Sequence, residues 1–177
     1  MGTPQISRAI DSYRSTCNAQ AMEHRKLMEQ AIALSQEGMR LGDGGPFGAV
    51  VARRGEVIAE GWNRVLSSHD PTAHAEVVAI RAAAKSLGSF SLDGCVLYSS
   101  CEPCPMCLAA TYWARIEHVY FANTRADAAA IGFDDQFFYD ELSRPVSDRS
   151  LPMTHMEVAG AALPMQAWRE ETKKISY

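Results

Sequence analysis

Apolar positions in the first third of the chain follow a helical period and then a strand period. Residues 23–41 carry apolar side chains at helical spacing, which predicts an amphipathic helix that stops at Gly42. Residues 47–52 and 56–65 flank a turn at residues 53–55, and they are predicted to form the two strands of a hairpin.

The rest of the chain alternates short strands with helices. The turn at residues 67–76 leads into an alanine-rich helix that ends at Gly88, with Asp70 or Thr72 as its expected cap. The later elements are a strand at 95–99, a helix at 104–115, a strand at 118–122, a short helix at 125–131, a last strand at 155–159 and a terminal helix at 163–174. This alternation predicts an α/β layer structure, and the hairpin makes its five-stranded sheet mixed.

The composition is that of one ordinary globular domain. The chain has 177 residues, of which 47% are apolar, enough to bury one core. We read residues 1–21 as a poorly ordered or helical extension and residues 22–177 as a single domain. The apolar runs are too short for a membrane span and the N-terminus lacks the apolar stretch of a secretory signal, so we expect a cytoplasmic protein without a membrane partner. A net charge of −4 disfavours long nucleic acids, which usually require a basic face.

Three of the five cysteines lie in one segment, SCEPCPMC at residues 100–107. Cys104 and Cys107 are three residues apart, so they project from one face of a helix whose N-terminus favours thiolates. Such a pair serves either a metal or a thiol–disulfide oxidoreductase. An odd cysteine count in a chain without a secretion signal favours a metal or catalysis over a disulfide framework.

His74, two residues before Glu76, supplies the missing metal ligand. One histidine and two cysteines fill three of the four tetrahedral positions of zinc, as in catalytic sites. We therefore predict one zinc ion per subunit on His74, Cys104 and Cys107, with a water or hydroxide as fourth ligand. Because zinc lowers the pKa of water to about 7, Glu76 is the expected proton carrier beside it. Cys101 is an alternative fourth ligand that would close the site and leave only a structural zinc in a binding module.

Two motifs resemble the signature of the cytidine-deaminase-like zinc hydrolases, an H-x-E followed by P-C-x-x-C. They are DPTAHAE at residues 70–76 and SCEPCPMC at residues 100–107. The resemblance implies a three-layer α/β/α fold, and it implies that Cys101 is not a ligand. Three further segments, GDGGPFGAVV at 42–51, AIGFDD at 130–135 and MQAWR at 165–169, are similar to bacterial guanine deaminases of this superfamily.

The resemblance to guanine deaminases implies a reaction and a set of site residues. The reaction is the hydrolysis of guanine to xanthine and ammonia, in purine catabolism or salvage. Glu76 and Asp135 take the catalytic roles, and the base is contacted by Asn63, Phe47, Ala75, Trp113, Asp135 and Tyr177. The resemblance also implies a homodimer that exchanges residues 133–177 as C-terminal lids.

Two of these residues fit guanine on their own chemistry. The Asn63 amide both donates and accepts, so it matches the O6 or N7 edge of a purine. A carboxylate at Asp134 or Asp135 is an acceptor-only fork, and it fits the ring N–H and exocyclic amine of guanine. Deaminases of guanosine, cytosine or tRNA adenosine share the metal motifs and stay as alternatives, with aminated triazines as side substrates. The acidic charge and the long C-terminal segment argue against tRNA.

Overall fold

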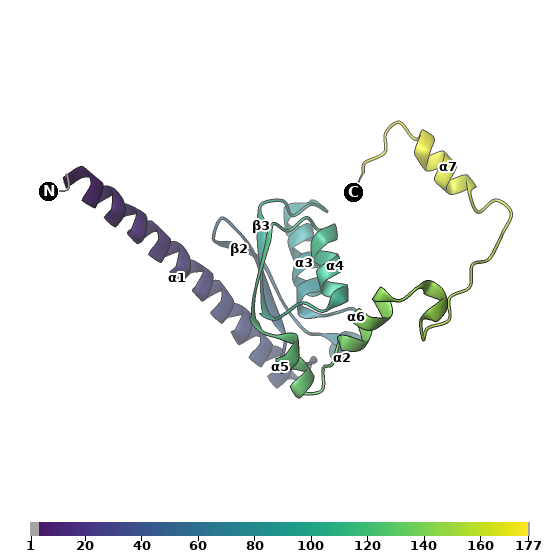
Figure 1. Cartoon of the computed structure of the whole chain (residues 1–177), viewed down its shortest axis with the longest axis horizontal. Coiled ribbons are helices and arrows are strands. Elements are labelled where there is room, and N and C mark those ends of the chain that lie inside the picture. The colour runs from purple at the N-terminus through teal and green to yellow at the C-terminus, as the bar shows by residue number, and fades with distance from the viewer. Residues whose placement is uncertain (1–3, 177) are drawn as a thin grey trace. The chain divides into compact units, whose positions relative to one another are not determined.

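The computed structural model describes residues 4–176, and it describes side chains from residue 18 onward. The chain folds as two compact units, Met1–Asp134 and Asp135–Tyr177 (Figure 1). The first unit contains the sheet and the helices around it.

A four-stranded mixed sheet with the order β2-β1-β3-β4 forms the centre of the first unit. β1 (Gly48–Arg53) pairs antiparallel with β2 (Glu56–Trp62) and with β3 (Cys95–Cys101). β3 pairs in parallel with β4 (His118–Asn123). The predicted hairpin and the mixed character of the sheet are therefore confirmed.

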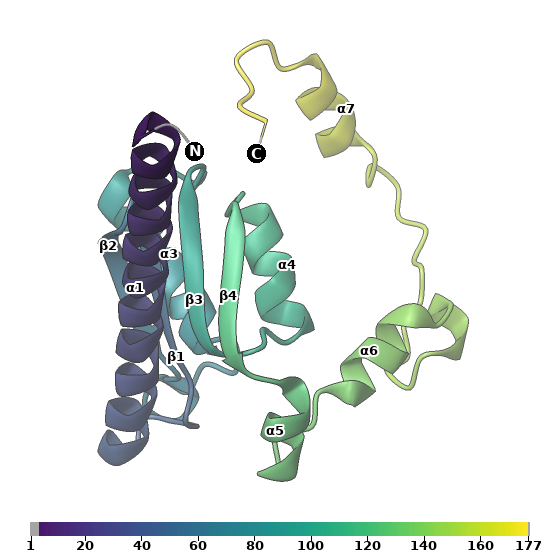
Figure 2. The ribbon, with the colours of Figure 1, turned by 60° about the vertical axis from the view of Figure 1, so that its left-hand side comes forward.

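Helices cover both faces of this sheet and make three layers (Figure 2). α1 (Pro4–Leu41) packs on one face, where its Leu27 and Ala31 join a core with Val50 and Tyr98 of the strands. α3 (Ala75–Leu87) covers the other face with small side chains, and α4 (Pro105–Trp113) lies beside it. Among the described residues, none of the helices combines the length and apolarity that a membrane span requires.

A glycine brings α3 close to the hairpin. A Cβ at Gly61 of β2 would lie 2.6 Å from the carbonyl oxygen of Ala75, the first residue of α3. Only a residue without a side chain allows this approach. The start of α3, next to His74, is thus held directly against the sheet.

β2 is shorter than the sequence predicts. The strand expected through residue 65 ends at Trp62, and α2 (Val65–Ser68) follows as a single helical turn. The backbone N–H groups of Leu66 and Ser67 donate to the carbonyl oxygen of Asp43, at 3.0 and 3.1 Å, instead of continuing the ladder. The chain therefore leaves the sheet just before Asn63.

The prediction of a fifth strand at residues 155–159 is wrong, because the structure shows this segment as irregular backbone. A strand is stable only beside another strand that satisfies its N–H and C=O groups. The regular elements described in the second unit are all helical: α6 (Gln136–Ser143), a 3-10 turn (Val146–Asp148) and α7 (Leu163–Glu170). α7 is also shorter than the terminal helix predicted over residues 163–174.

A short helix closes the first unit. α5 (Arg125–Ala130) begins with a capping box, in which the Thr124 hydroxyl accepts from the Asp127 N–H and the Asp127 carboxylate accepts from the Thr124 N–H. This agrees with the helix predicted at residues 125–131.

Candidate metal centre

Two helix N-termini bring three ligand-type side chains together. His74 is the N-cap residue of α3, Cys104 is the N-cap residue of α4, and Cys107 lies in the first turn of α4. N-cap side chains usually accept a hydrogen bond from their own helix, but the side chains of His74 and Cys104 do not. They face each other instead, which leaves both free to serve as ligands.

The separations of the three ligand atoms fit a tetrahedral zinc ion. The Nδ1 atom of His74 lies 3.5 Å from the Sγ atoms of both Cys104 and Cys107. All three atoms lie within 4.8 Å of one another. Zinc bonds of about 2.0 Å to nitrogen and about 2.3 Å to sulfur, at tetrahedral angles, place the nitrogen about 3.5 Å from each sulfur. The site can therefore accept the ion with little movement.

Proton sharing within the group points to the same conclusion. A hydrogen bond with the Cys107 thiol lowers the pKa of Cys104 to about 4, while this bond raises the pKa of Cys107. The hydrogen bond with Cys104 also raises the pKa of His74. The two sulfur atoms are thus close enough to share a hydrogen bond, and a divalent cation can take the place of its proton.

Cys101 is not part of this group. Cys101 is the last residue of β3, and its Sγ atom lies 3.5 Å from the carbonyl oxygen of Thr124. Within the described part of the chain, the metal-binding group consists of His74, Cys104 and Cys107 alone. The structure therefore supports a three-residue group without Cys101.

Glu76 lies in the first turn of α3, two residues after the histidine ligand. Its side chain is buried, with 6% exposure, and its Oε1 atom accepts a hydrogen bond of 3.3 Å from the Ser99 hydroxyl. Burial raises the pKa of this carboxyl group. A buried carboxyl beside the metal ligands has the properties of a proton carrier.

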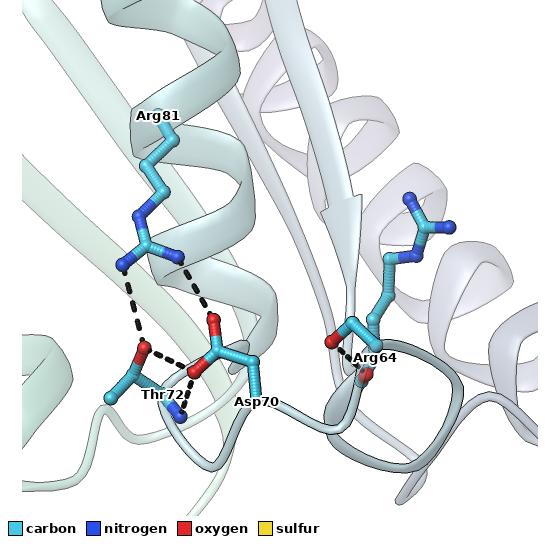
Figure 3. Close-up of polar contacts among 5 residues, drawn as sticks. Arg64, Asp70, Thr72 and Arg81 are labelled. Atoms are coloured by element: carbon cyan, nitrogen blue, oxygen red, sulfur yellow. Dashed lines mark hydrogen bonds and ion pairs between the residues drawn. The ribbon is translucent and has the colours of Figure 1, made fainter.

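The turn that carries His74 is closed by its own polar network (Figure 3). The Oδ1 atom of Asp70 accepts hydrogen bonds from the N–H and the hydroxyl of Thr72, at 2.8 and 2.7 Å. Arg81, on α3, reaches back to Asp70 Oδ2 at 3.3 Å and to the Thr72 hydroxyl at 3.4 Å. Asp70 and Thr72 therefore stabilise the turn and do not cap the helix as predicted, which leaves the N-cap position to His74.

Asn63 is buried where the chain leaves β2, with 5% exposure. Its N–H donates to the carbonyl oxygen of Phe47 at 2.9 Å, and its Oδ1 atom accepts from the N–H of Val65 at 3.2 Å. A Cβ at Gly44 would clash with the same Oδ1 atom. With Oδ1 fixed in this way, the Nδ2 group is the part of the amide left to donate to a ligand.

Phe47 packs against Phe133 in an edge-to-face contact, with ring centroids 4.9 Å apart. Gly45 makes room for this pair, because a Cβ there would lie 2.8 Å from the Phe133 ring. The sequence pattern does not predict this contact between Phe47 and Phe133.

The remaining predicted residues lie in different parts of the chain. Ala75 is buried at the start of α3, whereas Trp113, at the end of α4, is 67% exposed. Asp135 is the N-cap residue of α6 in the second unit. Tyr177 lies outside the described residues. The structure thus brings His74, Cys104, Cys107 and Glu76 together, and the roles of the others stay predictions.

Sequence comparison places these residues in a known family. Residues 21–123 match the family described as the cytidine and deoxycytidylate deaminase zinc-binding region. The chain is 50% identical to the guanine deaminase of Bacillus subtilis (strain 168) over 156 residues. This alignment covers 88% of the present chain and 100% of the Bacillus subtilis protein. The chain is also 38% identical over 116 residues to the tRNA-specific adenosine deaminase of Haemophilus influenzae, covering 65% of this chain and 66% of that one.

Solved structures agree with this match. The X-ray structure of guanine deaminase from Bacillus subtilis has a TM-score of 0.85, with 50% identity, and covers 87% of this chain and 98% of that chain. A guanine deaminase structure from Nitrosomonas europaea has a TM-score of 0.58, with 36% identity, and covers 62% of this chain and 63% of that chain.

Fold and site together define an α/β protein with a zinc site at His74, Cys104 and Cys107. The chain belongs to the cytidine and deoxycytidylate deaminase family. The matched region contains all three ligands and Glu76, so the paired cysteines are metal ligands and not a redox pair.

Proposed function

We propose that the chain is a zinc-dependent guanine deaminase, which hydrolyses guanine to xanthine and ammonia in purine catabolism or salvage. The observation that carries this proposal is the three-ligand centre beside a buried glutamate, in a chain half identical to a guanine deaminase over 88% of its length. We place the reaction in the cytoplasm, where thiol ligands stay reduced.

Glu76 moves the protons of the proposed reaction. Zinc, when bound, acts as a Lewis acid that makes water a nucleophile near neutral pH. Glu76 accepts a proton from the attacking water and delivers it to the ring nitrogen next to the attacked carbon. It then takes the proton of the hydroxyl group that has been added to this carbon and transfers it to the amine, which leaves as ammonia while the C=O bond forms.

Substrate orientation is assigned to residues around the metal centre. The Asn63 Nδ2 group donates to an acceptor on the purine, since Oδ1 is held by the Val65 N–H. Phe47, Ala75 and Trp113 are proposed to pack around the ring. Asn63 is buried and Phe47 is half-buried, and both lie close to the glycine-rich turn, which supports their assignment to the base.

Asp135 is proposed to recognise guanine by accepting hydrogen bonds from its ring N–H and its amine. Asp135→Asn replaces one carboxylate oxygen, a hydrogen-bond acceptor, by an amide NH₂ group, which is a donor. This donor would face an N–H donor of guanine, so kcat/KM for guanine is expected to fall by about 100-fold. Xanthine formation measures this effect, with zinc content and melting temperature unchanged. Asp134→Asn is the matched control and keeps its activity. Equal xanthine production by the Asp135 variant would contradict the assignment.

A homodimer is proposed because the second unit has no core of its own. None of its described residues is buried, and it exposes large side chains: Phe137, Phe138, Leu142, Met153, Met156, Met165 and Trp168. Such a segment gains stability only by docking. We propose that residues 133–177 form a lid exchanged between subunits, with Tyr177 closing the partner's pocket. Sedimentation should show a dimer, and a fully active monomer would contradict the exchange.

A substrate panel tests the proposed reaction. Zinc-loaded protein is incubated with guanine, guanosine, cytosine, cytidine and adenine, and with a tRNA, and ammonia or inosine is measured. Guanine is expected to be the preferred substrate, by at least about tenfold in kcat/KM. Preference for guanosine, cytosine or the tRNA adenosine would replace the proposal by that activity.

A further inference from the structure

The face of β3 that points toward α3 carries a serine next to the proton carrier. Side chains alternate along β3, so Leu97 packs with the α3 side of the core and Tyr98 packs with the α1 side. Ser99 shares the side of Leu97, and its hydroxyl donates to Glu76 Oε1 at 3.3 Å. Both groups are withdrawn from water, with exposures of 2% for Ser99 and 6% for Glu76.

A glutamate that carries protons must keep one orientation through two transfers. The glutamate side chain has several rotatable bonds. Rotation about them would move the carboxyl oxygen that accepts the proton away from the reacting groups. The Ser99 hydroxyl lies 3.3 Å from the Glu76 carboxyl group in a buried setting, where a polar contact restricts its rotation. Ser99 contacts Oε1 of Glu76, and the carboxyl group also forms hydrogen bonds with its own backbone N–H and with the Cys107 thiol.

We propose that Ser99 is a positioning residue, whose hydroxyl contacts Glu76 Oε1 and thereby helps to fix the orientation of the carboxyl group. This inference rests on the proposed role of Glu76 as proton carrier. Ser99 lies on a rigid central strand, hydrogen-bonded to β1 on one side and β4 on the other, so it supplies a fixed point for a helix residue. No other function is evident for a hydroxyl buried at this place.

The next residue provides a matched control. Ser100 is also 2% exposed, but its hydroxyl lies on the other side of the strand and accepts from the N–H of Gly48 at 2.9 Å. It therefore stabilises the start of β1. Loss of its hydroxyl should lower the melting temperature, because the Gly48 N–H loses its partner, with little change in kcat.

The test compares Ser99→Thr with Ser99→Val in the full zinc-loaded chain. Threonine and valine have the same shape and differ by the hydroxyl. Relative to Ser99→Thr, the valine variant is expected to lose about tenfold in kcat, with KM and zinc content within twofold. Ser99→Ala and Ser100→Ala form a second pair that avoids added bulk, and only the Ser99 variant should lose kcat. In crystals of Ser99→Val the Glu76 carboxyl should be rotated, and in crystals of Ser99→Thr it should not.

Two results would overturn the inference. One is an equal kcat for the threonine and valine variants with an unmoved Glu76 carboxyl, and the other is an equal loss of kcat in Ser99→Ala and Ser100→Ala. If the wild-type chain deaminates another compound of the panel, the same comparison is made with that substrate. If it deaminates none, the proposed function fails, and the orientation of Glu76 in the two crystal structures still decides whether Ser99 positions it.

Discussion

Glu76→Gln is expected to lower kcat by about 10⁴-fold, the upper end of the contribution of proton transfer by a side chain. Glutamine has nearly the same shape as glutamate and can still accept the hydrogen bond of Ser99, but it cannot carry a proton. KM should change little, because the substitution keeps the shape of the side chain and leaves Asn63 unchanged. Ammonia release measures the loss, and the zinc content reports whether the metal centre is preserved.

The same variant should not lose stability. Burial raises the pKa of Glu76 in the folded chain above its unfolded value. Such a group stabilises the fold fully below its unfolded pKa, and this stability is lost as the pH rises through the folded pKa. Glutamine does not ionise, so the variant should melt at the same temperature as the wild type or higher at neutral pH. Turnover at the wild-type rate would remove Glu76 from the mechanism.

The sequence predicts the metal centre well because the ligands lie in local motifs. His74 and Glu76 are two residues apart, and Cys104 and Cys107 are one helical turn apart, so each pair is oriented by its own helix. What joins the pairs is the position of α3 and α4 on one face of the sheet. The alternation of strands and helices along the chain predicts such layers.

Local propensity alone did not predict where α3 begins. Asp70 and Thr72 are both good N-cap residues, yet their side chains bond to each other and to Arg81 (Figure 3). That network closes the turn, and the helix begins one residue after His74. The choice depends on Arg81, which is brought back to the turn only after the helix has formed.

The Ser99–Glu76 contact depends on the register between a strand and a helix. The alternation in β3 places Ser99 on the same side as Leu97, and this signal is visible in the sequence. The sequence does not show that Ser99 contacts Glu76 of α3, because this depends on how α3 packs on the sheet. The close approach of Gly61 to Ala75 is part of that packing. The fifth strand was overpredicted for a related reason, because residues 155–159 have strand-like alternation but are shown without a strand beside them.

Cys107→Ser is expected to remove both zinc and turnover. A serine hydroxyl is a poor zinc ligand, so two ligands remain where the geometry is built for three. The bound metal should fall well below one per chain, and ammonia release should become undetectable. Since an ion that binds only the folded chain stabilises it, the melting temperature should fall toward that of chelator-treated wild-type protein. Added zinc should restore turnover to the chelated wild type and not to the variant.

Cys101→Ser is the matched control for this loss. Cys101 lies three residues before Cys104, and its thiol contacts the Thr124 carbonyl oxygen instead of the metal group. A serine hydroxyl can make the same hydrogen bond, so zinc content and turnover should stay within about threefold of the wild type. Zinc loss in this variant would mean that four protein ligands enclose the ion. With no coordination position left for water, hydrolysis at this centre would be impossible.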